Sequence, residues 1–179
     1  MTVWFTGDTH FHHKWMAKWR GYQSVEDMHA GIIERWNDLV AKNDDVWHLG
    51  DFAFGRQADA RIIFNELHGK KHLIRGNHDP KWAGRLPWAA VHDVREFRHD
   101  GHRIWLSHYP HLTWPKAHHG TWHLHGHSHG NLGAETTTRM DVGMDATGDV
   151  LIPLDTIIDV MTSRQYVTVD HHDPDTATE

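Results

Sequence analysis

Seven Asp, Asn and His side chains come directly after short runs of β-branched, aromatic and aliphatic residues, at the points where predicted strands end. They are Asp8, His10, Asp51, Asn77, His108, His127 and His129. In open α/β sheets, sites form in the crevice outside the carboxyl ends of the strands. Although these residues are scattered along the chain, we therefore expect their side chains to be gathered in space.

The residue types in this set are those that bind transition-metal ions. The chain has 21 histidines and no cysteine, so a bound metal must be held through nitrogen and oxygen. The lack of cysteine also excludes disulfides, a thiol nucleophile and thiolate zinc sites. Mixed imidazole and carboxylate ligands suit manganese, iron or zinc better than calcium.

Strands and helices alternate in the first part of the chain. Short apolar runs predict strands over 2–6, 46–49 and 71–75, and apolar residues three and four apart predict helices over about 25–41 and 58–67. The first of these helices begins at a capping box, Ser24 to Asp27. This order argues for parallel strands with helices packed outside them.

The second part of the chain has a different character. Further strands are predicted over 94–99, 103–107, 121–125 and 141–144, and a last helix over 153–161. Asp100-Gly101 joins the first two of these strands as a hairpin turn. There is no internal repeat or linker, so we expect one domain over 1–169, followed by a polar and flexible tail over 170–179.

The short motifs around the seven residues resemble the signature of the calcineurin-like metallophosphoesterase superfamily, in particular its small bacterial and phage branch. The motifs are Asp8-Thr9-His10, Gly50-Asp51, Gly76-Asn77-His78-Asp79, Ser107-His108 and Gly126-His127-Ser128-His129. All of them occur in the family's order, and the resemblance spans residues 2 to about 145. It implies an α/β fold, an αββα sandwich of two mixed β-sheets flanked by helices.

The resemblance also implies a role for each motif residue. Two adjacent divalent ions are expected, with Mn²⁺ favoured and iron or zinc as alternatives. The first ion would be held by Asp8, His10, Asp51 and His129, and the second by Asp51, Asn77, His108 and His127. Asp51 is then shared between the two ions.

Three further residues receive expected roles. His78 would act as general acid and protonate the leaving oxygen, with a purely structural histidine as the alternative. Asp79 would orient or charge-stabilise His78, or would be a turn residue before Pro80. His13 stands where that branch often has a histidine, which implies a contact with the substrate phosphate.

The implied activity is hydrolysis of small phosphodiesters, such as 2′,3′-cyclic nucleotides, by attack of a hydroxide that bridges the two ions. The alternatives are a nuclease on longer nucleic acid, a phosphomonoesterase or protein phosphatase, and a non-catalytic scaffold. The formal net charge of −6 and the lack of a Lys/Arg cluster argue against strong binding of duplex DNA. The segments 80–93 and 109–120 are too short for a cap domain, so we expect an open, shallow site.

Two smaller expectations concern location and the loop tryptophans. No apolar stretch approaches the ~20 residues that cross a bilayer and no signal-peptide pattern is present, so a cytoplasmic protein without membrane contact is expected. Trp82, Trp88 and Trp114 lie in predicted loops. They would either stack on a base of the substrate or cover the edge of a sheet, and we favour the covering role.

Overall fold

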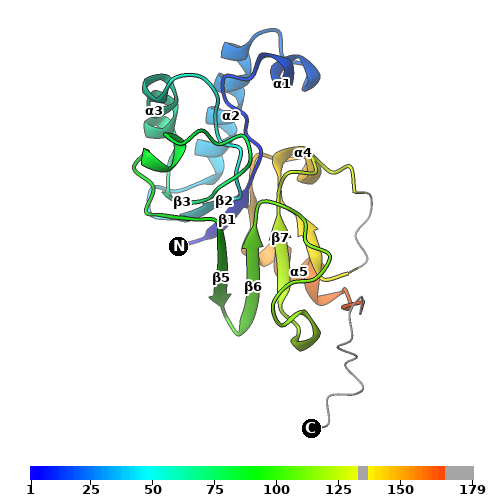
Figure 1. The fold of residues 1–179 in the computed structure, drawn as a ribbon. Coiled ribbons are helices and arrows are strands. Elements are labelled where there is room, and N and C mark those ends of the chain that lie inside the picture. Colours follow the sequence, from blue (N-terminus) through cyan, green and yellow to red (C-terminus); the bar gives the residue numbers. More distant parts are fainter. Residues whose placement is uncertain (133–136, 168–179) are drawn as a thin grey trace, which may run out of the picture.

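The computed structural model describes residues 1–132 and 137–167 and is built from two β-sheets with helices around them (Figure 1). The strands are β1 (Val3–Thr6), β2 (Asp45–His48), β3 (Lys70–Ile74), β4 (Ala90–His92), β5 (Val94–His99), β6 (His102–Ser107), β7 (Trp122–His125), β8 (Arg139–Asp141) and β9 (Ile152–Pro153). The helices are α1 (Lys14–Trp19), α2 (Val25–Leu39), α3 (Gln57–Glu66), α4 (Met144–Thr147) and α5 (Leu154–Thr162), with short 3₁₀ turns at Ala83–Arg85 and Ala117–His119.

Both sheets are mixed. The first has the order β4-β3-β2-β1-β9, in which β9 runs antiparallel to β1 and the other pairs are parallel. The second has the order β5-β6-β7-β8, in which only the β5–β6 hairpin is antiparallel. The predicted αββα sandwich of two mixed sheets is therefore confirmed.

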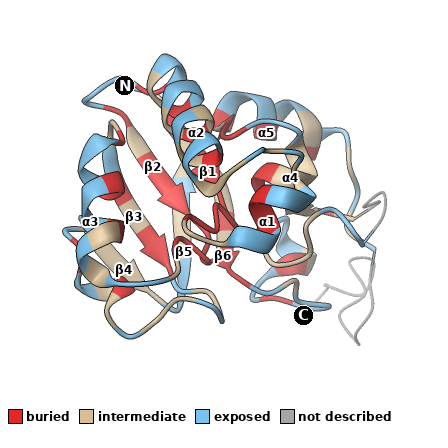
Figure 2. Cartoon of the chain, turned by 90° about the horizontal axis from the view of Figure 1, so that it is seen from above, coloured by how far each residue is buried: buried red, intermediate tan, exposed pale blue. Residues whose placement is uncertain are grey.

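Two apolar layers hold the sandwich together. The outer layer lies between the first sheet and the helices α2 and α3, which expose their far sides to solvent (Figure 2), and it includes Ile32, Trp36 and Phe64. The inner layer lies between the two sheets and is closed by α5; it includes Phe5 and Leu106. Because side chains alternate along a strand, β1 and β2 contribute to both layers, with Trp4 and Val46 in the outer one and Phe5 and Trp47 in the inner one.

The loop tryptophans belong to this packing. Trp82 and Trp88 are partly buried against the outer layer, and the indole of Trp88 donates to the carbonyl of Ala83 over 2.8 Å. Trp114 is buried, and its indole donates to the carbonyl of Thr121 over 2.7 Å. All three tryptophans thus pack on the protein itself, and their favoured role as a cover for the edge of a sheet stays a prediction.

Some short elements differ from the prediction. The strand expected over 141–144 ends at Asp141, because the Asp141 carboxylate accepts a hydrogen bond from the amide of Gly143 over 2.8 Å and turns the chain into α4. Helix α1 was not predicted, since six residues are too few to show a helical period. It begins where His13 Nδ1 accepts from the amide of Met16 over 3.2 Å.

In the described part of the chain, no helix has the length and apolar character needed to cross a membrane. The predicted tail over 170–179 lies outside the described residues.

Candidate metal centre

Five of the seven predicted ligand residues adopt a backbone conformation that residues with side chains seldom adopt. The φ angle is +57° at Asp8, +50° at His10, +60° at Asp51, +69° at His127 and +48° at His129. Left-handed backbone costs a non-glycine residue roughly 1–2 kcal/mol. Strain of this kind concentrates at functional sites, where the surrounding structure holds it in place.

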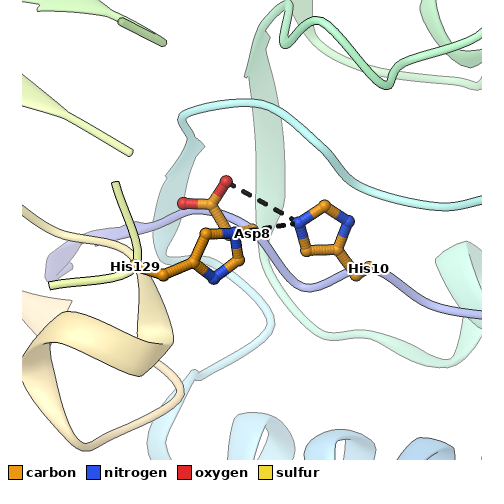
Figure 3. Close-up of side chains that lie close together, drawn as sticks. All are labelled: Asp8, His10 and His129. Atoms are coloured by element: carbon orange, nitrogen blue, oxygen red, sulfur yellow. Dashed lines mark hydrogen bonds and ion pairs between the residues drawn. The ribbon is translucent and has the colours of Figure 1, made fainter. Parts of the chain in front are cut away.

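Asp8, His10 and His129 form the first of two groups that can hold a metal ion, and their ligand atoms all lie within 4.8 Å of one another. His10 Nε2 is 3.3 Å from His129 Nε2 and 4.0 Å from Asp8 Oδ1 (Figure 3). Ligands that each stand about 2 Å from one ion are about 3–4 Å apart. The three side chains are therefore spaced as ligands of a single ion.

The surroundings of Asp8 fit a bound cation. The residue is fully buried, and its Oδ2 accepts from the amide of His127 over 2.9 Å. Its Oδ1 has no hydrogen-bond partner. Burial raises the pKa of this carboxyl well above its usual value, although the neighbouring His129 opposes that shift. Burial of an oxygen without a hydrogen-bond donor costs free energy. A metal ion in the first group would give Asp8 Oδ1 the positive partner that it lacks.

Asp51, His108 and His127 form the second group. His108 Nδ1 donates to the carbonyl of Leu49 over 2.7 Å, so Nε2 presents its lone pair to the group. Asn77 Oδ1 lies 2.9 Å from that nitrogen. Burial lowers the pKa of His108 to about 4, which keeps it neutral, as a metal ligand must be. The lone pairs of His108 Nε2 and Asn77 Oδ1 face each other, and a cation between them would bind both.

Asp51 lies between the two groups. Its Oδ2 is 3.8 Å from His10 Nε2 and 3.5 Å from His108 Nε2. Its Oδ1 accepts from the amide of His78 over 2.8 Å, which leaves Oδ2 to face both groups. Burial raises the pKa of this carboxyl as well, while the His78 amide opposes the shift. The structure thus brings the seven predicted ligand residues into one site at the ends of the strands.

Two glycines of the motifs make room for the buried carboxylates. A Cβ atom on Gly76 would overlap the carboxylate of Asp51, and a Cβ atom on Gly126 would lie 2.6 Å from Asp8 Oδ2. Real Cβ atoms do not approach other atoms so closely. Glycine is required here because backbone and carboxylate come into direct contact.

A buried ion pair that sequence analysis missed supports the first group. Asp145 Oδ2 accepts from His129 Nδ1 over 2.7 Å, which turns His129 Nε2 toward the group. Arg20 donates two further hydrogen bonds to the Asp145 carboxylate, over 2.8 and 2.6 Å, and another to the carbonyl of Thr9. Burial by itself raises the pKa of Asp145, but the hydrogen bonds from His129 and Arg20 outweigh it and lower the pKa.

No sequence signal pointed to this pair. Arg20 lies at the end of a helix that was not predicted, and Asp145 lies in α4, where a strand had been expected up to position 144. An ion pair between residues so far apart in the chain becomes visible only when the fold brings them together.

The Asp79 carboxylate accepts hydrogen bonds from backbone amides of two loops. Its oxygens accept from the amides of Asp51, Phe52 and Gly76 over 3.0, 2.9 and 2.8 Å. The carboxylate therefore ties the loop after β2 to the loop after β3. Asp79 thus positions the two loops. Its expected roles, to orient or charge-stabilise His78 or to act as a turn residue before Pro80, stay predictions.

His78 and His13 lie at the rim of the first group. The His78 ring is 5.9 Å from the ring of His10 and 5.5 Å from that of Phe54, between centroids, and the residue is exposed. The His13 ring is 4.5 Å from Phe54 and 5.8 Å from His10. Both are placed where a substrate can reach them, and their roles stay predictions.

The Asp145 carboxylate offers a test of this support. We expect Asp145→Asn to weaken Mn²⁺ binding by about 10–100-fold, because His129 loses its anionic partner. The substitution also leaves the buried Arg20 without a counter-charge and should lower the free energy of unfolding by about 3–5 kcal/mol. Titration calorimetry with Mn²⁺ and urea unfolding in the presence of a chelator measure the two effects.

Asp149→Asn is the matched control. Asp149 pairs with Arg35 at the surface, where the side chains are 50% and 48% exposed, so both quantities should change little. Unaltered Mn²⁺ affinity in Asp145→Asn would show that this carboxylate does not support a metal ligand.

Comparison with solved structures supports the fold. The protein of unknown function AQ665 from Aquifex aeolicus matches with a TM-score of 0.69 at 22% identity, over 89% of this chain and 98% of that chain. The phosphoesterase Yfce from E. coli and an archaeal phosphodiesterase match with TM-scores of 0.46 and 0.49, at 21% and 18% identity. They cover 86% and 80% of this chain, for 82% and 84% of their own.

Comparison with curated sequences identifies relatives. No model of a known protein family matches the chain. The uncharacterized protein MJ1445 of Methanocaldococcus jannaschii is 32% identical over 133 residues, which cover 72% of this chain and 70% of that protein. The Gene 66 protein of Mycobacterium phage D29 is 32% identical over 188 residues, which cover 87% of this chain and 93% of that protein. This chain therefore belongs to the same protein family as the Gene 66 protein of phage D29.

Proposed function

We propose that the protein is a phosphoesterase that hydrolyses small phosphodiesters with two adjacent divalent ions, Mn²⁺ being favoured over iron or zinc. The observation that carries the proposal is the pair of His/Asp groups that face each other across Asp51. We assign Asp8, His10, Asp51 and His129 to the first ion and Asp51, Asn77, His108 and His127 to the second. The unpartnered oxygen of Asp8 supports this assignment.

The donor set suits phosphate chemistry. Two divalent ions beside the carboxylates of Asp8 and Asp51 leave a charge of about +2, which attracts a phosphate anion without the help of lysines. When bound, two such ions lower the pKa of a shared water and stabilise the attacking and leaving oxygens of an in-line displacement.

The protein's own side chains supply the remaining steps. His78 is exposed at the rim, and its ring can donate a proton to the leaving oxygen. The backbone amide of His78 donates a hydrogen bond to Asp51 Oδ1, which keeps the His78 loop against the metal centre. His13 uses Nδ1 to cap α1, which leaves Nε2 to contact the substrate phosphate. In this scheme Asp145 and Asp79 hold the ligand loops and do not touch the substrate.

Small diesters, with 2′,3′-cyclic nucleotides as the leading example, are the substrates that we favour. The formal net charge is −6, and a basic surface normally supplies most of the affinity for a polynucleotide backbone. Opening a strained cyclic diester releases energy and keeps the leaving oxygen close to His78. A nuclease, a phosphomonoesterase or protein phosphatase and a non-catalytic scaffold are the competing functions.

A substrate panel tests the proposed function. With Mn²⁺ at moderate salt, we expect hydrolysis of 2′,3′-cyclic AMP to be faster than that of p-nitrophenyl phosphate or linear duplex DNA. Fast degradation of the duplex with little turnover of the cyclic nucleotide would favour a nuclease. Failure to hydrolyse any of the three with metals bound would favour the scaffold.

The shared carboxylate tests the metal assignment. We expect Asp51→Asn to lose at least one of two bound ions per chain and nearly all activity, because one oxygen of Asp51 faces both groups. Elemental analysis and the cyclic-nucleotide assay measure the two effects. Asp59→Asn, which removes a carboxylate from a surface pair with Arg56, should retain both ions. Full metal content and full activity in Asp51→Asn would contradict the assignment of Asp51 to both ions.

The general acid is tested by the leaving group. We expect His78→Ala to keep its metals and to lose about 10²–10⁴-fold in rate on 2′,3′-cyclic AMP, whose leaving alkoxide needs a proton. The loss on bis-p-nitrophenyl phosphate should be much smaller, since p-nitrophenolate leaves unaided. His99→Ala, at the remote β5–β6 hairpin, is the control. Equal losses on both substrates would instead indicate that His78 positions the substrate.

A further inference from the structure

A hollow of about 230 Å³ lies beside the first metal-binding group. It is lined by Trp15, Met16, Trp19, His129 and Asn131. His129 belongs to both places, because it is one of the three residues of the first group. The hollow therefore adjoins the candidate metal centre at His129.

Two exposed tryptophans form one wall of this hollow. Trp15 is 61% exposed and Trp19 is 50% exposed. They stand four residues apart on α1 and hence on the same side of the helix, with ring planes 11° from parallel and centroids 5.9 Å apart. The Trp19 ring meets the His129 ring at 88°, with centroids 6.1 Å apart. Two parallel, exposed indole rings thus lie beside a predicted metal ligand.

Packing of the protein core does not account for these indoles. Helix α1 turns Met16 and Ala17 inward, and both are buried. At its carboxyl end, Arg20 is held by Asp145 and by the carbonyl of Thr9. The helix is therefore anchored through residues other than the tryptophans, and this anchoring needs no bound ligand.

Exposed aromatic rings next to a proposed phosphate-binding centre suit one class of ligand. Indole rings stack on nucleobases, and because every base has a π face, such stacking tolerates any base. A nucleoside phosphoester carries its base one sugar away from its phosphate. With the phosphate at the metal centre, the adjoining hollow lies within reach of the base.

We propose that Trp15 and Trp19 form a subsite that stacks on the nucleobase of a nucleoside phosphodiester, and so select nucleotides over other small diesters. This inference rests on the proposed function, because it needs a phosphate at the metal centre. The subsite recognises the aromatic face and not the identity of the base. The four common nucleobases are therefore accepted, with purines preferred for their larger face.

The test compares two strained diesters that differ only in the base. These are 2′,3′-cyclic AMP and the 2′,3′-cyclic phosphate of methyl riboside. For the Mn²⁺-loaded chain we expect kcat/KM to favour the base-bearing substrate by on the order of 10–100-fold, the range that stacking on one base supports. In the double variant Trp15→Ala/Trp19→Ala, the preference should fall to within about 3-fold.

Two controls separate stacking from folding. Trp15→Phe/Trp19→Phe keeps aromatic faces and should retain most of the preference. Ile62→Ala, which removes a side chain that is 61% exposed on the distant α3, should retain all of it. If the wild type shows no preference, or if the alanine variant keeps it in full, the subsite is overturned while hydrolysis of both substrates still supports the proposed function.

A binding measurement decides the case in which neither diester is hydrolysed. Calorimetry with adenosine 3′-monophosphate and the Mn²⁺-loaded chain should show on the order of 10–100-fold weaker binding in the alanine variant. That result would support the subsite even though the proposed function had failed, and equal binding would overturn the subsite as well. A wild-type dimer that becomes a monomer in the alanine variant would assign the tryptophans to self-association and overturn the proposal.

Discussion

The carboxylates of Asp8 and Asp51 are buried where the two sheets meet, and one oxygen of Asp8 has no hydrogen-bond donor. Buried carboxylates are tolerated when they are paired, hydrogen-bonded or bound to metal. Arg20 is close, but its guanidinium is held by the Asp145 carboxylate and by backbone carbonyls. A cation bound between histidine and carboxylate ligands would neutralise these buried carboxylates. The other residues of the site are arranged around that position.

A layer of polar contacts keeps the strained loops in position. Asp79 binds three amides of the loops after β2 and β3, and Asp145 connects His129 to Arg20. These contacts are made within the fold and do not need a bound ligand. They offset the cost of left-handed backbone at the ligand residues, so the donor atoms are aimed before an ion arrives.

Helix α1 contacts the candidate metal centre in two ways. Arg20, directly after the helix, meets Asp145, while Trp15 and Trp19 expose their rings beside His129. The same short helix thus supports a predicted metal ligand and presents the aromatic surface that we assign to the base of a substrate. By contrast, Trp82, Trp88 and Trp114 pack on the protein itself.

The sequence by itself predicted the alternation of strands and helices in the first part of the chain, the hairpin at Asp100-Gly101 in the second part, and the seven candidate ligands. These features are local, because apolar periods and short motifs at strand ends are read over a few residues. Tertiary structure alone decided that Asp145 is the partner of His129, that Asp79 binds the amides of two loops, and that Trp15 and Trp19 are exposed. The physical reason is that hydrogen bonds and burial depend on segments far apart in the chain, which come into contact only when the two sheets pack together.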